Sequence, residues 1–447
     1  MKKVLVSRGI TEGMPAAVRV LQATHGGGFG PDEAWFYEGT DELLEARKWI
    51  LNYSLNKAKE RIASEKAKKD NKTGDAMVDV GQEDGESPQS KERLYTDLKV
   101  GVLTCNKHAI MANLVLELQK FTQNSSEVGD ERTVSSCSFS PDGSHLTTCS
   151  WNNLIKVWDV ETLQCVKEIR AHKERISHVS YYPYGTPVIN YGVKPEEAVD
   201  NTAPRTLDLA SCAADSTVKL WNSASGTHLA TLTGHNDRVC RMAWHPSGRY
   251  MGTTSFDMTW MLWDLETGKC ILEQEGHYKP VYAIAFQGDG SLVATGGLDS
   301  IARLWDLRSG KPIWNMRGHV KQILAVDWAP NGYQVLTGSD DHTLRIWDLR
   351  KKSSLYIIPA HTSLISSARY QPKYGNYVLS SSYDKTIKLW SMQDFSLIKE
   401  LKGHGDKVTH VELSPRSSEH SQAPAMFAST SFDLTWKTWK IDHSVTV

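Results

Sequence analysis

Short apolar segments separated by turn-forming residues dominate the C-terminal two thirds of the chain. Segments such as residues 281–286 and 292–295 are rich in β-branched and small apolar residues. Turn sequences such as Pro246-Ser247-Gly248 separate segments of this kind. Strand-length apolar segments bounded by such turns are typical of antiparallel sheets. The pattern therefore predicts an all-β fold.

A polar motif recurs at fixed spacing within these segments. Between Gly234 and Trp347, each of three units opens on Gly-His, has an Asp 22 residues after the His and a Trp 6 residues after the Asp. The three sets are His235, Asp257 and Trp263; His277, Asp299 and Trp305; and His319, Asp341 and Trp347. The whole pattern repeats every 42 residues. A period of this length that opens on Gly-His and closes on Trp-Asp is typical of one β-propeller blade.

Seven units follow one another, and each ends on a tryptophan. These residues are Trp158, Trp221, Trp263, Trp305, Trp347, Trp390 and Trp439. The intervals between them are 63, 42, 42, 42, 43 and 49 residues, so we expect insertions at residues 184–205 and 416–424. The first unit is atypical, because Asn152 takes the Asp position and residues 128–132 stand where Gly-His is expected. The sequence predicts a seven-bladed WD-repeat β-propeller over residues 112–441.

The last blade needs a strand from elsewhere in the chain. Only eight residues follow Trp439, so the outer strand of this blade is expected within residues 112–132. Such closure removes two exposed sheet edges. Residues 114–118 fit a helix or a strand equally well.

An N-terminal helical arm is predicted over residues 35–69, with Thr40 and Asp41 as candidate caps and residues 52–54 as a candidate break. Its apolar face must be buried, either on its own propeller or on a partner. The candidate partner-binding residues are Trp35, Tyr37, Trp49, Ile50, Tyr53 and Leu55. Residues 1–34 are unassigned and expected to be flexible, residues 70–111 are a partly disordered linker, and residues 442–447 are a tail.

Composition and charge narrow the function classes. The formal net charge of -1 argues against a broadly basic nucleic-acid-binding protein. No segment approaches the ~18 apolar residues of a membrane helix, so no membrane association is expected. The seven cysteines include no C-x-x-C pair, which favours reduced thiols over a zinc site or disulfide framework.

The loops that follow each Gly-His carry cations on one face of the ring. These candidate rim contacts are Arg175, Arg238, Lys279, Lys321 and Lys407. Such a ring would suit RNA phosphates or an acidic peptide. Neighbouring acids, Glu174, Asp237 and Asp406, leave a solvated mixed-charge rim as the alternative.

The recurring His and Asp residues, with Ser255 or Ser339 nearby, superficially suggest hydrolytic triads. A catalytic site occurs once, whereas this set recurs in six units, each with its Asp 6 residues before its Trp. We therefore expect a buried structural network, in which the Asp accepts from the His and the hydroxyl and Trp N–H orient the His. No catalytic residue, metal ligand or cofactor site is predicted, and the protein is not expected to be an enzyme.

Motifs outside the repeat resemble one family. They include Trp35-Phe36-Tyr37-Glu38-Gly39, Ala46-Arg47-Lys48-Trp49-Ile50, Val128-Gly129-Asp130-Glu131-Arg132, Trp244-His245-Pro246-Ser247-Gly248-Arg249 and Thr295-Gly296-Gly297-Leu298-Asp299. Over residues 35–441 the chain resembles the pre-mRNA-processing factor four family, the WD-repeat subunit of the U4/U6 small nuclear ribonucleoprotein (snRNP). That family's N-terminal splicing-factor motif is not visible in residues 1–34.

The resemblance implies a non-catalytic scaffold subunit of the U4/U6 snRNP and the U4/U6.U5 tri-snRNP, acting in splicing in the nucleus. The implied partners are a processing-factor-three-type protein, a spliceosomal cyclophilin and the U4/U6 snRNAs, contacted directly or through partners. Residues 35–62 match the region through which the family engages such partners. The alternative is a generic WD-repeat adaptor, such as the substrate receptor of a ubiquitin ligase, although no F-box-like pattern occurs in residues 35–69.

Overall fold

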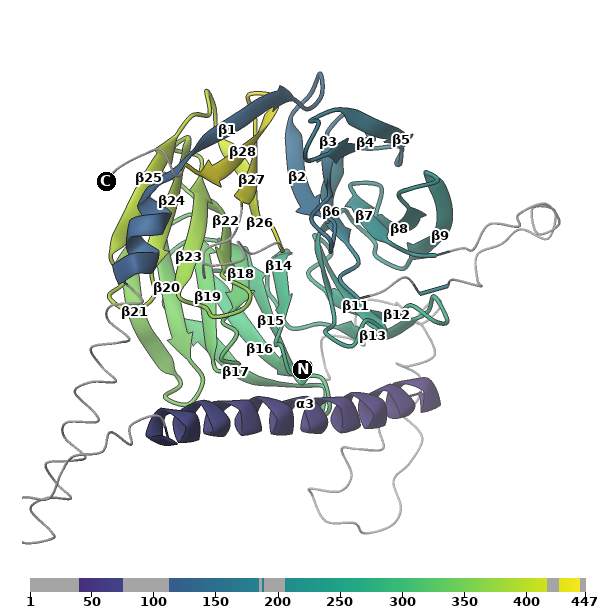
Figure 1. Cartoon of the computed structure of the whole chain (residues 1–447). Helices are drawn as coiled ribbons and strands as arrows, with labels where there is room; N and C mark the ends of the chain where they lie inside the picture. The colour runs from purple at the N-terminus through teal and green to yellow at the C-terminus, as the bar shows by residue number, and fades with distance from the viewer. Residues whose placement is uncertain (1–39, 75–111, 185–186, 189–205, 416–425, 443–447) are drawn as a thin grey trace, which may run out of the picture.

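Seven four-stranded antiparallel sheets surround a central channel in the computed structural model (Figure 1). The structure describes residues 40–74, 112–184, 187–188, 206–415 and 426–442. Each sheet is one propeller blade, so the predicted fold class is confirmed. Trp35, Tyr37 and nearly all of the two predicted insertions lie outside the described residues.

The blades are numbered in chain order, and their strands run from the channel outwards. Blade 1 contains β2 (Val134–Phe139), β3 (His145–Ser150), β4 (Leu154–Asp159) and β5 (Cys165–Arg170). Blade 2 contains β6 (Ile176–Tyr181), β7 (Leu209–Ala213), β8 (Thr217–Asn222) and β9 (Thr227–Thr233). Blade 3 contains β10 (Val239–Trp244), β11 (Tyr250–Ser255), β12 (Trp260–Asp264) and β13 (Cys270–Gln274). Blade 4 contains β14 (Val281–Phe286), β15 (Leu292–Gly297), β16 (Ile301–Asp306) and β17 (Lys311–Arg317).

Blades 5 to 7 complete the ring. Blade 5 contains β18 (Ile323–Trp328), β19 (Gln334–Ser339), β20 (Thr343–Asp348) and β21 (Ser353–Pro359). Blade 6 contains β22 (Ile365–Tyr370), β23 (Tyr377–Ser382), β24 (Thr386–Ser391) and β25 (Leu397–Lys402). Blade 7 contains β26 (Val408–Leu413), β27 (Met426–Ser431), β28 (Thr435–Ile441) and β1 (Phe121–Val128).

The core lies between neighbouring blades. Every residue of the second strands β11 and β23 is buried, because these strands are covered on both faces by adjacent sheets. The outermost strands β9 and β17 instead mix buried and exposed positions. This difference in burial explains why the sequences of the inner strands consist almost entirely of small and apolar residues.

The strand that closes the ring is β1, which pairs with β28 in antiparallel register from Phe121–Ile441 to Val128–Thr435. Residues 112–119 form a helix, so the ambiguous segment 114–118 is helical. Leu114 and Leu118 are buried with Phe121 against blades 6 and 7. Blade 7 is thus built from residues at both ends of the propeller sequence.

The arm is one continuous helix, α3 (Asp41–Gly74), which lies beside β13 at one edge of the ring (Figure 1). Thr40 Oγ1 accepts from the Leu43 N–H, so the predicted N-terminal cap is present. The predicted break at residues 52–54 is wrong, because Ser54 Oγ donates to the Leu51 carbonyl within the helix at 3.1 Å. The helix also ends later than Lys69. Within the described residues, no helix combines the length and hydropathy needed to cross a bilayer.

Candidate functional site

The recurring polar motif forms one hydrogen-bonded chain in each blade that carries it. In blade 3, His235 Nδ1 lies 2.8 Å from Asp257 Oδ2, and His235 Nε2 lies 2.8 Å from Thr253 Oγ1. Trp263 Nε1 donates to the same hydroxyl at 2.8 Å. All groups are satisfied if the imidazole is neutral with its proton on Nδ1, because the Thr253 hydroxyl then donates to Nε2.

Five other blades repeat this chain. Their His, hydroxyl and Trp members are His172, Ser211 and Trp221; His277, Thr295 and Trp305; His319, Thr337 and Trp347; His361, Ser380 and Trp390; and His404, Ser429 and Trp439. In every case the imidazole also contacts the turn Asp. The repetition identifies a recurring buried network rather than a single reaction centre, and we expect this network to stabilise the blades.

Two details of the predicted network are wrong. The hydroxyl that reaches the imidazole belongs to Thr253 and its counterparts, not to Ser255 or Ser339. Ser255 lies at the strand end, where its hydroxyl donates to the Asp237 carbonyl and accepts from the Asp257 N–H. Thr253 lies two residues further inside the strand, at the depth of Nε2. The Trp N–H reaches this hydroxyl rather than the His ring.

The electrostatics favour a neutral His beside an ionised Asp. Burial lowers the pKa of His277 and of His319, and this effect outweighs the opposing bonds from Asp299 and Asp341. Burial acts against ionisation of Asp257, but the hydrogen bonds from His235 and Thr259 prevail and lower its pKa to about 2. These hydroxyls are buried, so the network offers no accessible nucleophile in the six blades that carry it.

Replacing Asp299 with Ala should lower the melting temperature. The change leaves the buried His277 Nδ1–H without its acceptor and removes bonds to the Ile301 and Tyr278 N–H groups. We expect a loss of about 2–4 kcal/mol in the free energy of unfolding. Thermal unfolding followed by circular dichroism measures the loss, with Asp394→Ala on an exposed turn as the matched control. Unchanged melting together with lost function would contradict the structural role.

In blade 1 the acidic residue of the motif stands at the His position, and the turn position is neutral. Asp130 lies where the other blades carry His, and it accepts from Ser150 Oγ and from Asn152 Nδ2. Lys156 Nζ lies 3.7 Å from the same carboxylate, which is almost completely buried. The charge is therefore inside the blade, and the turn carries the neutral amide of Asn152 in place of a carboxylate.

Three of the five predicted rim cations, Arg175, Arg238 and Lys407, lie against aromatic rings that sequence reasoning missed. Arg175 Cζ lies 5.4 Å from the centre of the Trp151 ring, and Arg238 Cζ lies 3.4 Å from that of Phe256. These aromatic residues immediately precede the turn Asp or Asn of the motif, a position that would have identified them.

The remaining rim cations differ in their surroundings. Lys407 Nζ lies 5.3 Å from the Tyr383 ring and 5.7 Å from the Phe432 ring. Lys321 pairs with Asp340 at 3.7 Å. Lys279 is exposed on the blade 4 loop. Three of the five predicted cations thus lie against aromatic rings, whereas Lys321 is paired with an acid and Lys279 is exposed.

A concavity of about 600 Å³ on this rim brings together Arg175 and Arg238 but not Lys279, Lys321 or Lys407. Its lining residues are Arg132, Trp151, Asn152, Asn153, Glu174, Arg175, Ala214, Asp237 and Arg238. Three arginines therefore face two acids around a Trp, and the neutral Asn152 replaces a carboxylate. The site can take a ligand that combines negative charge with flat apolar surface.

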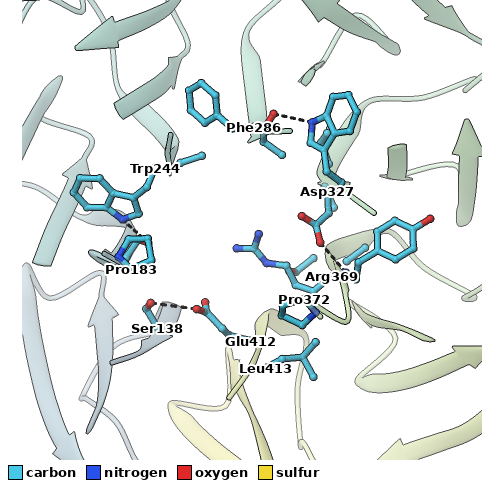
Figure 2. A pocket seen from close by; sticks show the side chains of 18 of the residues that line it. Ser138, Pro183, Trp244, Phe286, Asp327, Arg369, Pro372, Glu412 and Leu413 are labelled. Carbon is cyan, nitrogen blue, oxygen red and sulfur yellow. Dashed lines mark hydrogen bonds between the residues drawn. The ribbon is translucent and has the colours of Figure 1, made fainter. Parts of the chain in front are cut away.

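The central channel contains a second cavity of about 640 Å³ (Figure 2). Arg369 points into this space between Asp327 and Glu412, as Figure 2 shows. Asp327 accepts from the Tyr370 N–H at 2.7 Å, and Glu412 accepts from Ser138 Oγ at 3.2 Å. The two carboxylates therefore join neighbouring blades, and Arg369 offsets their charge. Burial raises the pKa of Glu412 to about 7, with Arg369 acting in the opposite direction.

Replacing Glu412 with Gln should change how stability depends on pH. The ordinary Glu pKa is 4.5, so the folded chain holds this proton more tightly than the unfolded chain. Protonated Glu412 therefore stabilises the folded chain. This contribution to the free energy of unfolding is fully present below the ordinary pKa and is lost as the pH rises through about 7, by up to about 3 kcal/mol. A glutamine side chain does not titrate. The free energy of unfolding of the Glu412→Gln variant should therefore increase relative to that of the wild type as the pH rises from about 5 to about 8.

Urea unfolding at both pH values measures this effect, and Glu45→Gln on the exposed side of α3 is the control. A difference between Glu412→Gln and wild type that stays constant with pH would contradict the assignment.

The arm packs on its own propeller through its buried face. Ile50 is 1% exposed and lies with Tyr250 and Trp260 in one core cluster. Trp49 stacks on Tyr53 with ring centres 5.5 Å apart and meets the edge of Tyr250. For these residues, the structure favours packing on the propeller over docking to a partner.

Polar contacts hold the rest of α3 against the blades. Tyr53 donates its hydroxyl to the Pro246 carbonyl at 2.8 Å. Arg61 binds Asp289 through two nitrogens and also donates to the Asn331 carbonyl. Leu55, on the same helix, is 46% exposed. Of the predicted arm residues that the structure describes, Leu55 alone is exposed.

Comparisons with known proteins agree with this architecture. The family described as WD domain, G-beta repeat matches residues 121–159, 163–222, 226–264, 268–306, 310–348 and 352–391. An uncharacterised WD repeat-containing protein of Schizosaccharomyces pombe, C227.12, is 38% identical over 236 residues, which cover 53% of this chain and 42% of the relative.

Relatives from organisms as different as mouse and yeast carry the name U4/U6 small nuclear ribonucleoprotein Prp4. The U4/U6 small nuclear ribonucleoprotein Prp4 of Mus musculus is 36% identical over 225 residues, 50% of this chain and 35% of the relative. The Saccharomyces cerevisiae protein of that name is 31% identical over 234 residues, 51% of this chain and 39% of the relative. The matches thus span less than half the length of these relatives, and they support a Prp4-family assignment. The repeat matches and the seven observed blades establish that this chain belongs to the WD-repeat family.

Proposed function

We propose that the chain is a non-catalytic scaffold subunit of the U4/U6 snRNP and the U4/U6.U5 tri-snRNP, acting in pre-mRNA splicing in the nucleus. The observation that carries this proposal is the similarity to proteins named U4/U6 small nuclear ribonucleoprotein Prp4 in mammals and yeast, and to one named PRP4-like in Arabidopsis thaliana. The similarity reaches 39% identity over 45% of this chain. It is therefore spread over several blades rather than confined to one repeat.

The geometry is suited to a scaffold. Six blades are fixed by the same buried His and Asp chain, so the ring is a rigid platform whose exposed loops are free to differ. The rim offers cations and aromatic rings, while α3 adds a surface beside blades 3 to 5. These separate surfaces could bind protein and RNA at the same time.

The proposed partners are a processing-factor-three-type protein, a spliceosomal cyclophilin and the U4/U6 snRNAs. We assign the protein contact of the arm to the side that carries Leu55, because Ile50 is buried in the propeller. The RNA contact is assigned to the rim, where Arg175 and Lys407 are exposed.

Capture of the tagged chain from nuclear extract tests the proposal. We expect U4 and U6 RNAs to be enriched over the other small nuclear RNAs when the bound RNA is sequenced. The salt concentration must be low enough to keep assembled particles intact. A tagged WD-repeat protein of unrelated function is the control. Equal recovery of U4 and U6 by both proteins would overturn the proposal.

A further inference from the structure

We propose that one half of the propeller rim binds single-stranded RNA. The surface consists of Tyr383, Phe432, Trp151, Lys407 and Arg175, which we call the aromatic–cationic track. This inference rests on the proposed function, because it assigns the RNA contact to particular residues. It also adds a chemical class, unpaired rather than duplex RNA.

The rings of the track form a continuous row across three blades. Tyr383 and Phe432 have ring centres 5.6 Å apart, and Phe432 and Trp151 have ring centres 5.5 Å apart. Both pairs meet edge to face, with interplanar angles of 77° and 82°. The three residues take the same position in the turns of blades 6, 7 and 1. The row therefore follows the rim and is half-buried along its length.

Cations lie beside this row at both ends. Lys407 Nζ lies beside the Tyr383 and Phe432 rings, at 5.3 Å and 5.7 Å from their centres. Arg175 Cζ lies 5.4 Å from the centre of Trp151. Both cations are exposed, so each can meet a phosphate while resting on a ring. Alternation of stacking surfaces and cations is how proteins bind unpaired strands without reading sequence.

The 600 Å³ concavity extends the track beyond Arg175. Arg132 and Arg238 also line it, so three guanidinium groups border this space. Glu174 and Asp237 oppose them, and the Asp237 carboxylate accepts from the backbone N–H of Arg238 at 2.6 Å. A guanidinium has a flat face that can stack on a base and a fork of N–H donors that can hold a phosphate through two bonds, whereas a lysine ammonium binds a phosphate as a point charge. The concavity therefore suits a nucleotide at the end of the strand.

The other half of the rim, around blades 4 and 5, exposes a different set of side chains. Tyr278 and Val320 are 75% and 82% exposed on the loops of blades 4 and 5. Lys321 is paired with Asp340 there. Phe256 and Tyr278 on blades 3 and 4 each lie against a single arginine, Arg238 or Arg303. Among the described residues, ring-to-ring contacts along the rim join Tyr383, Phe432 and Trp151 of blades 6, 7 and 1, so we assign RNA to that half. Unpaired RNA fits better than a duplex, since base pairing and stacking leave no base face free for the rings.

Fluorescence anisotropy of the purified full chain tests this assignment. The probe is a labelled oligouridine of about 12 nucleotides, compared with a labelled RNA duplex of similar length. We expect the single strand to bind more tightly, with affinity that falls from about 50 mM to about 200 mM salt. The double variant Arg175→Glu and Lys407→Glu should weaken binding at least about tenfold at the lower salt concentration.

The double variant Lys279→Glu and Lys321→Glu is the matched control, since it makes the same charge change on the other half of the rim. It should weaken binding less than about threefold. Equal losses in the two double variants would overturn the assignment, because the effect would then be one of overall charge. Absence of RNA binding, or preference for the duplex, would overturn it as well.

A poly-glutamate peptide is tested as a competitor to separate RNA from an acidic protein partner. If the peptide binds the track and oligouridine does not, the surface is a protein site and the inference is wrong. The proposed function is judged separately. Enrichment of U4 and U6 from extract by the Arg175→Glu and Lys407→Glu variant would preserve the snRNP assignment even if the purified chain bound no RNA.

Discussion

Replacing Phe121 with Asp is expected to prevent stable folding of the propeller. Phe121 is fully buried and its ring centre lies 5.1 Å from that of Phe427. Truncating a buried Phe costs about 3–5 kcal/mol, and burying an unpaired carboxylate adds several more. The sum approaches the roughly 5–15 kcal/mol total stability of a typical domain. Detachment of β1 would also expose the edge of β28.

The measurement is the yield of soluble protein, followed by circular dichroism and size-exclusion chromatography. Val128→Asp is the matched control, because Val128 lies at the other end of β1 and is 68% exposed. We expect that control to fold normally. A Phe121→Asp protein with wild-type melting would show that β1 contributes little to the ring.

Replacing Trp49 and Ile50 together with Ala should lower the melting temperature. Ile50 is buried against Tyr250 and Trp260, and Trp49 packs on Tyr53 and Tyr250. The loss of the Ile50 side chain alone should cost about 2–5 kcal/mol, and the loss of the Trp49 contacts adds to it. Thermal unfolding measures the effect.

Leu55→Ala is the control for this pair, because Leu55 lies on the same helix and is exposed. Its melting should match that of the wild type. If Trp49→Ala with Ile50→Ala left melting unchanged but reduced capture of protein partners, the arm would be a docking element rather than part of the propeller core.

The regular part of the fold was predictable from sequence because each blade repeats one bonding requirement. In each blade a buried His needs a hydrogen-bond acceptor at the same place in the structure. The number of residues from His277 to Asp299 therefore recurs in adjacent blades. The choice of Thr295 as the hydroxyl partner was not visible, because it depends on depth within the strand rather than on spacing alone.

The functional surfaces were less predictable. Charge alone identified Arg175 and Lys407, but their contacts with Trp151 and Phe432 depend on how turns of neighbouring blades meet. Helical periodicity identified the apolar face of the arm, yet could not decide what covers it. Ile50 proved to face the propeller, which required the positions of Tyr250 and Trp260 in blade 3.

The pairing of β1 with β28 has a consequence for how the protein folds during synthesis. Phe121 leaves the ribosome long before its partner Ile441, and at about 5–20 residues per second the interval is roughly 15 s to about a minute. During that time six blades can form, while β1 has no partner strand. Contacts of such long sequence separation form slowly. The nascent chain therefore presents the unpaired strand β1 until β28 has been made, which makes this interval the one in which chaperones would matter most.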